Sequence, residues 1–209
     1  SITGEYSPET GSYETCQITV NDTVYTNEIH YYEMTPYLVK AGEHTYLYIE
    51  DIAESDFTKV SVYEITNSLI TYKGEFHGVL KDFINSSDFK LTKRMDLLST
   101  YFAKADCYVG RDGMPVERSN VYVVDGEMKL TSTVEITAEL VDENGNLLGA
   151  TYLFPEGTDF QFMATDGETY ADMLADDGQR CRFYSTPDWP VTVNGMDATQ
   201  SFETLWYAG

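Results

Sequence analysis

Tight-turn signals recur along the C-terminal half of the 209-residue chain, and they constrain its fold more than any other feature. Asp-Gly or Asn-Gly pairs begin at Asp112, Asp125, Asn144, Asp166, Asp177 and Asn194. These residues accept the positive φ that short hairpin turns require. Between the turns lie short runs rich in Val, Ile, Thr, Tyr and Phe, at 121–124, 134–141, 159–164, 170–174 and 180–184. The pattern predicts an antiparallel sandwich-like or small barrel-like unit without βαβ crossovers.

The N-terminal half also has a β pattern, in which Tyr, Val, Ile and Thr alternate with polar residues. Strands are predicted at 17–26, 29–40, 45–50, 59–65 and 68–73. The Asn21-Asp22 pair indicates a turn inside the first of these segments. We expect residues 1–85 to form an antiparallel meander, so the fold class is all-β throughout.

Residues 77–105 are ambiguous, because apolar residues there have both helical and strand-like spacing. We expect little helix, at most a turn or two within 78–103. The charge also changes here: residues 86–124 hold six basic and five acidic groups, whereas residues 1–85 sum to −10 (4 − 14) and residues 125–209 to −13 (3 − 16). These shifts predict an N-terminal unit over 1–85 and a C-terminal unit over 86–209, packed together as one compact body.

The formal net charge of −22 excludes several classes of partner. Nucleic-acid binding needs a basic stripe that displaces counterions, and docking to an anionic membrane needs a polybasic patch. Neither can be built from 13 Lys and Arg against 35 Asp and Glu. A hydrophobic fraction of 42% indicates a folded chain, and no apolar run has the length of a membrane-spanning helix. The opening SITGEYSPET shows no leader and suits a chain trimmed after one.

The cysteines Cys16, Cys107 and Cys181 lie far apart, without the CxxC spacing of a structural zinc site. We expect buried free thiols; one disulfide with a leftover thiol is the alternative. No catalytic residue is predicted, because the chain lacks HExxH and GxSxG motifs.

Clustered acidic residues leave two alternatives open. Paired carboxylates could support glycoside or cell-wall hydrolysis. The candidates are Glu50, Asp51, Asp56, Asp176 and Asp177. Calcium is the one cofactor that the sequence suggests, because acidic turns offer hard oxygen ligands. Its candidate ligands are Asp51, Asp56, Asp176 and Asp177; otherwise we expect no cofactor.

Tyrosines suggest a second kind of site. Alternation places Tyr46 and Tyr48 on one face of a strand, with Leu47 and Ile49 on the other. If the Leu/Ile face is the core, Tyr46, Tyr48 and the nearby Tyr63 form an exposed platform that could bind a sugar or a protein partner. The alternative is that tyrosines line both faces of a two-layer protein.

Residues 153–162, Leu-Phe-Pro-Glu-Gly-Thr-Asp-Phe-Gln-Phe, resemble the strand start of bacterial SH3-type barrels, and this resemblance spans about 134–185. Cys181-Arg-Phe stands where wall-binding repeats of that type carry Gly-Trp-Val, so the resemblance implies a fold and not wall binding. The whole chain, with Tyr46-Leu-Tyr-Ile-Glu and Leu205-Trp-Tyr-Ala-Gly, is similar to uncharacterised secreted or lipid-anchored β-proteins of Gram-positive bacteria. That similarity implies an extracytoplasmic location and assigns no activity.

The sequence therefore predicts a non-enzymatic, extracytoplasmic β-protein that takes part in surface interaction or ligand binding. Its expected partner is a cell-surface glycan or protein, and neither nucleic acid nor membrane insertion of the domain is expected. Two alternatives stay open. One is a carbohydrate-binding module that uses the tyrosine face, and the other is a hydrolase that uses paired carboxylates.

Overall fold

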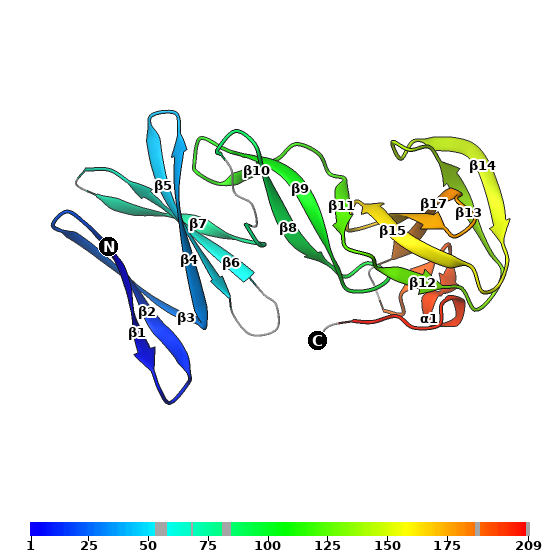
Figure 1. Cartoon of the computed structure of the whole chain (residues 1–209), viewed down its shortest axis with the longest axis horizontal. Coiled ribbons are helices and arrows are strands. Elements are labelled where there is room, and N and C mark those ends of the chain that lie inside the picture. The colour runs from blue at the N-terminus through cyan, green and yellow to red at the C-terminus, as the bar shows by residue number, and fades with distance from the viewer. Residues whose placement is uncertain (53–57, 68, 81–84, 187–188, 208–209) are drawn as a thin grey trace. The chain divides into compact units, whose positions relative to one another are not determined.

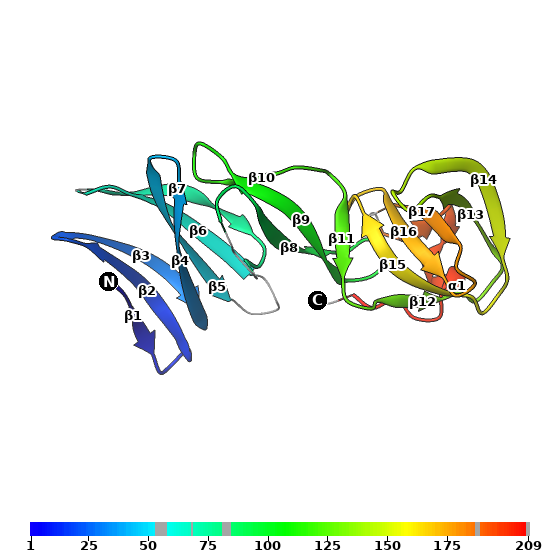
Figure 2. The same cartoon turned by 45° about the horizontal axis from the view of Figure 1, so that its top comes forward.

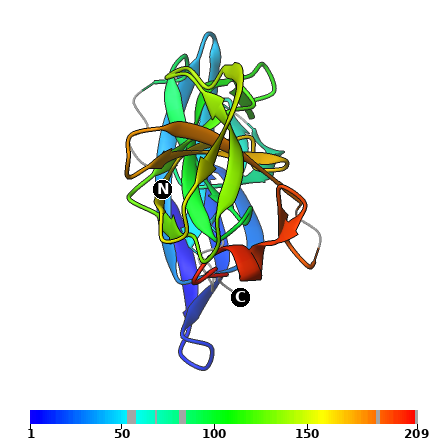
Figure 3. The same cartoon turned by 90° about the vertical axis from the view of Figure 1, so that its right-hand side faces the viewer.

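The protein is all-β, as the sequence predicts, with antiparallel strands forming nearly all of its regular structure (Figure 1). The computed structural model describes residues 1–52, 58–67, 69–80, 85–186 and 189–207. Within that part the one helix is the single turn α1 (Ala198–Ser201), red in Figure 3. No helix among the described residues has the length and apolar character needed to cross a membrane.

Little helix is expected within 78–103, and the described residues of that segment contain none. They form the strand β8 (Phe89–Met95), the start of β9 (Tyr101–Val109) and the connections beside them. Residues 81–84, where helical spacing is also present, lie outside the described part. Alternating burial along β9 shows that the strand-like period prevails over the helical one.

The chain divides into two compact units. The first comprises Ser1–Leu91 and Asp106–Arg118, and the second comprises Thr92–Ala105 and Ser119–Gly209. The sequence-based division at residue 85, in contrast, assigns both 86–91 and 106–118 to the second unit. Strands β8 and β9 each contribute residues to both units, so the first unit is discontinuous in sequence.

The first unit contains two antiparallel sheets. One is ordered β1 (Ile2–Ser7), β2 (Ser12–Val20) and β3 (Thr23–Tyr31). The other is ordered β4 (Glu33–Ala41), β5 (His44–Ile52), β6 (Thr58–Ile65) and β7 (Ile70–His77) (Figure 2). The predicted meander is therefore present but changes sheet at Tyr32, which interrupts the strand predicted over 29–40.

The four-stranded sheet is buried on both faces along β5. Leu47 and Ile49 pack with Cys16, Ile18 and other residues of the three-stranded sheet. On the opposite face, Tyr48 contacts Phe76 edge-on, with 5.8 Å between ring centroids. The turn between β9 and β10 (Pro115–Glu117) also contacts that opposite face, so residues 46–51 of β5 have no solvent-facing side.

The second unit is built on one antiparallel sheet. Its hydrogen-bonded order is β9, β11 (Tyr122–Asp125), β15 (Asp159–Thr165), β16 (Tyr170–Ala175), β17 (Arg180–Thr186), β13 (Ile136–Val141) and β14 (Leu147–Phe154). Four strands lie off this path: β8, which pairs with β9, and the short strands β12 (Lys129–Thr131), β18 (Thr192–Val193) and β19 (Met196–Asp197). Hairpins β13–β14, β15–β16 and β16–β17 turn at the predicted Asn144-Gly145, Asp166-Gly167 and Asp177-Gly178 pairs, whose glycines have positive φ.

The core of the second unit is an aromatic cluster. Edge-to-face contacts join Phe154 to Phe160 and Phe160 to Phe183, each with 5.0 Å between ring centroids. Near the C-terminus, Leu205 and Tyr207 pack against this cluster. The fold thus holds β13 and β17 on a rigid base and leaves β14 at the edge of the sheet.

Candidate functional site

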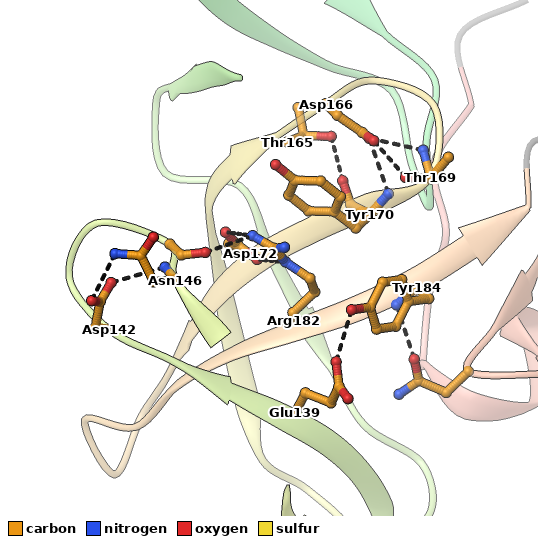
Figure 4. A network of polar contacts seen from close by, with 12 residues as sticks. Glu139, Asp142, Asn146, Thr165, Asp166, Thr169, Tyr170, Asp172, Arg182 and Tyr184 are labelled. Atoms are coloured by element: carbon orange, nitrogen blue, oxygen red, sulfur yellow. Dashed lines mark hydrogen bonds and ion pairs between the residues drawn. The ribbon is translucent and has the colours of Figure 1, made fainter. Parts of the chain in front are cut away.

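The side chain of Arg182 fixes the β13–β14 turn against the face of the second unit's sheet. Its Nε and Nη2 donate to the two carboxylate oxygens of Asp172, at 2.6 and 2.8 Å (Figure 4). Nη2 also donates to the backbone oxygen of Gly145, at 2.9 Å, and the guanidinium carbon lies 3.6 Å from the ring centroid of Tyr170. The hydrogen bond with Asp172 raises the pKa of Arg182. Paired on all these sides, a buried charge is tolerated and positions the turn.

Asp142 shapes the turn itself. Its Oδ1 accepts a hydrogen bond from the backbone N–H of Asn144 at 2.8 Å and another from that of Asn146 at 2.9 Å. Figure 4 shows Asp142 beside Asn146. Its Oδ2 accepts another from the Asn146 side chain, and these bonds lower the pKa of Asp142. Gly145 has a φ of +78°, which a glycine adopts without steric cost.

The inner strand β13 is held at further points. The Tyr184 hydroxyl donates to Glu139 at 2.7 Å, and the Asn194 side chain donates to the backbone oxygen of Thr137 at 2.8 Å. Since both β13 and its turn are fixed to the rest of the unit, the outer strand β14 is presented on a rigid support.

Strand β14 is an exposed sheet edge (Figures 1 and 2). Seven of its eight residues are exposed, and only Phe154 is buried. Its large apolar side chains are between 40% and 58% exposed, namely Leu147, Leu148, Tyr152 and Leu153. Apolar residues on both faces of one strand cannot be explained by packing onto a single core.

The edge has one of the usual protections against strand pairing, an irregularity in its first half, and lacks the others. Proteins protect edges with Lys, Pro, inward charges or bulges. Strand β14 carries no charged residue and no proline. A register shift opposite Glu139 to Val141 distorts its first half, whereas residues 151–154 keep regular pairing with β13. A continuous stretch of outward backbone N–H and C=O groups is therefore open to another strand.

A cavity of about 220 Å³ lies near the same turn, with lining residues that include Val123, Met163 and Arg180. Pockets for small molecules usually have volumes of roughly 300 to 1,000 Å³. This cavity falls below that range, so the edge is the stronger candidate site in the second unit.

The predicted tyrosine platform is wrong in its geometry. Tyr46, Tyr48 and Tyr63 have exposures of 1%, 0% and 0%, because β5 and β6 lie between two packed layers. Tyr46 and Tyr48 donate to backbone oxygens of the β9–β10 turn, and the Tyr63 hydroxyl accepts a bond from Asn27 at 3.1 Å. Burial raises the pKa of Tyr63 to about 12 and that of Tyr48 still further. The three tyrosines belong to the first unit's interior.

The candidate carboxylates are divided between the two units. Asp51 is buried in the first unit, whereas Asp176 and Asp177 are exposed in the β16–β17 turn of the second. Asp56 lies outside the described residues. Glu50 precedes Asp51 in β5, so the two side chains point to opposite faces and cannot form an acid pair. Searched over the described part of the chain, no three His, Cys, Asp or Glu residues come together as a metal-binding group.

All three cysteines are free and buried, which confirms the expectation of buried thiols. Burial is the main cause that raises the pKa of Cys16 to about 11 and that of Cys181 to about 12. Neither thiol is therefore a ready nucleophile near neutral pH.

Comparisons with protein-family models, with characterised proteins and with solved structures found no match to this chain. The assignment of β14 as the candidate site therefore rests on the geometry of the second unit alone. The sequence reasoning missed β14 as a site. The available signal was the uncharged run LLGATYLF in a chain where 23% of the residues are charged.

Proposed function

We propose that this is a non-enzymatic binding protein of the cell exterior, which recruits a partner polypeptide by adding an extended strand to β14. The observation that supports this proposal is the exposed, uncharged and proline-free edge of the second unit. In strand addition, backbone hydrogen bonds supply affinity and alternate side chains supply specificity.

Charge selects the kind of partner. Asp142 and Glu143 precede β14, Glu156 follows it, and the chain as a whole carries a charge of −22. A partner strand therefore combines an uncharged, partly apolar centre with Lys or Arg at both ends. Complementary charge increases the association rate and suppresses wrong partners. A second copy of this chain would bring acidic flanks against acidic flanks, so we do not expect self-association.

One strand added to an edge gives an interface at the small end of the range, below about 1,200 Å². Such interfaces are typical of transient complexes. We therefore expect a weak complex, with an affinity that falls as salt screens the flanking charges.

Synthetic strand peptides test the proposal. A labelled peptide with an alternating Thr/Val/Tyr core and two lysines at each end is titrated with the protein, and binding is followed by fluorescence anisotropy. The matched variants are Leu153→Lys, on the edge, and Val123→Lys, an exposed apolar residue on the internal strand β11. We expect Leu153→Lys to weaken binding at least tenfold and Val123→Lys to have little effect, although both change the net charge equally.

The same core flanked by glutamates is expected to bind at least tenfold more weakly at low salt. Equal weakening by the two lysine variants would contradict the proposal, because it would indicate general attraction of a basic peptide to an acidic protein. Absence of saturable binding, or a doubling of the 23.7 kDa mass in sedimentation without peptide, would also contradict it.

The location outside the cytoplasm is part of the proposal and is supported by the resemblance to secreted and lipid-anchored β-proteins. Fractionation of cells that express the native gene, followed by immunodetection, tests it separately. Recovery of the protein in the cytoplasm alone would remove this part and leave the strand-addition proposal standing.

A further inference from the structure

The first unit contains a groove of about 420 Å³ with a lining that contrasts with the rest of the chain. None of the described lining residues is Asp or Glu, although the chain has 35 acidic residues. Two of the 13 basic side chains, Arg111 and Arg118, line it together with His44, Ser86, Ser87 and Tyr108. A positively charged concave surface on so acidic a protein is unexpected unless it serves an anion.

Arg118 is oriented by its neighbours. Its Nη2 donates to the backbone oxygen of Ser87 at 2.5 Å, and its guanidinium carbon lies 5.1 Å from the ring centroid of Tyr108. Its backbone N–H is bonded to the Asp106 oxygen at 2.8 Å. An arginine has five N–H donors in a planar fork that fits an oxyanion. One donor is used by Ser87, so most of the fork is available at the groove.

Arg111 differs because its guanidinium has no hydrogen-bond or ion-pair partner within the described part of the chain. The backbone beneath it is nonetheless fixed. Its carbonyl accepts from the Tyr46 hydroxyl at 3.0 Å, and the Gly113 carbonyl accepts from Tyr48. The buried tyrosines thus position the turn that carries Arg111, which limits the entropy lost when a ligand binds.

Nearby acidic groups are already engaged. Asp112, next to Arg111, accepts a hydrogen bond from the backbone N–H of Met114 at 3.0 Å. Glu64 contacts His44 Nδ1 at 2.6 Å and Lys73 Nζ at 3.3 Å. Both carboxylates thus have partners of their own, and Arg111 and Arg118 are the Lys or Arg side chains among the groove's described lining residues.

We propose that this groove binds an oxyanion group of a small ligand, that is, a carboxylate, sulfate or phosphate. Arg111 and Arg118 supply the charge and the paired donors, Ser86 and Ser87 offer hydroxyl groups, and Tyr108 provides an aromatic wall. This site is distinct from the proposed strand-binding edge, which belongs to the second unit.

Titration calorimetry with sodium sulfate, inorganic phosphate and sodium glucuronate tests the proposal, with glucose as the neutral control. About 0.1 M sodium chloride screens the general repulsion between the acidic protein and an anion beyond roughly 10 Å. We expect saturable binding of at least one anion and none of glucose. Tighter binding of glucuronate than of sulfate and phosphate would assign the ligand to acidic sugars, and the reverse to free inorganic anions.

Arg111→Gln is the most direct variant, because the wild-type guanidinium has no hydrogen bond or ion pair to lose among the described residues. We expect it to weaken binding about tenfold, and Arg111→Lys to recover part of the loss. Arg180→Gln, which removes the same charge in the second unit, is the control and should bind as wild type. No saturable anion binding, or equal affinity in Arg111→Gln and Arg180→Gln, would overturn the proposal. The anion-binding test is independent of the strand-peptide titrations, because the two proposed sites lie in different units.

Discussion

Replacing Asp51 by Asn should make the stability of the first unit less dependent on pH. Asp51 is 2% exposed, in β5, and its Oδ2 has no hydrogen-bond partner in the described part of the chain. Burial is the largest cause that raises its pKa from 3.8 to about 6, while Lys59 partly lowers it. The folded protein therefore holds this proton more tightly than the unfolded chain does.

The magnitude follows from these two pKa values. They differ by about 2, and one pKa unit corresponds to about 1.4 kcal/mol, so ionisation of Asp51 costs the folded state roughly 3 kcal/mol. The free energy of unfolding loses this amount as pH rises from about 4 through about 6, and the loss is then constant. Asparagine does not ionise, so Asp51→Asn should gain about 2 to 3 kcal/mol relative to wild type between pH 4 and pH 8.

Urea denaturation followed by far-UV circular dichroism at pH 4, 6 and 8 measures this difference. Any constant cost of packing an amide cancels, because the same variant is compared across pH. Asp22→Asn, in the exposed β2–β3 turn, is the matched control and should show a far smaller change with pH. A difference between wild type and Asp51→Asn that is the same at all three pH values would refute the reasoning.

Two further pairs of substitutions, each a variant with its control, test packing and pairing by urea or thermal denaturation. Gly113→Ala should cost more than about 2 kcal/mol, because φ is +87° and the added Cβ would lie 2.5 Å from a buried tyrosine ring. Gly42→Ala is the control, because Gly42 also has a positive φ, +62°, but an added Cβ there would meet no other atom; it should cost only about 1 to 2 kcal/mol. If the two alanine variants lost equal stability, a clash between the added Cβ at position 113 and the tyrosine ring would be excluded. Asp172→Asn should cost about 3 kcal/mol, because it leaves Arg182 half-buried and incompletely paired. Asp106→Asn is the control, because Asp106 forms an exposed ion pair with a lysine, and it should cost less than about 1 kcal/mol. A larger loss of stability in Asp106→Asn than in Asp172→Asn would contradict the stabilising role of the Asp172–Arg182 pair.

The all-β class and the hairpins of the second unit could be predicted from sequence, because turn chemistry is local. Asn144-Gly145 needs only its own backbone preference to end a strand. The change of sheet at Tyr32 could not be predicted, since β propensity continues on both sides and only tertiary packing decides which sheet each half joins. The helix-like spacing of residues 95–102 was misleading because tertiary packing, and not the local pattern, decides the structure of that segment too.

The candidate sites were harder to predict because exposure depends on layers that are distant in sequence. Alternation correctly placed Tyr46 and Tyr48 on one face of β5 and Leu47 and Ile49 on the other. It could not show that residues 110–114 cover the tyrosine face, more than sixty positions further along the chain. Likewise, the exposure of β14 follows from its place at the end of the strand order, which no local pattern reveals.

The late arrival of that covering turn also has a consequence for synthesis on the ribosome. Residues 1–91 emerge with the tyrosine face of β5 finished but without the segment Asp106–Arg118 that belongs on it. Until residue 118 has left the exit tunnel, the hydroxyls of Tyr46 and Tyr48 lack their carbonyl acceptors, and two large rings stay open to water. The nascent chain therefore passes through a stage with an exposed aromatic surface.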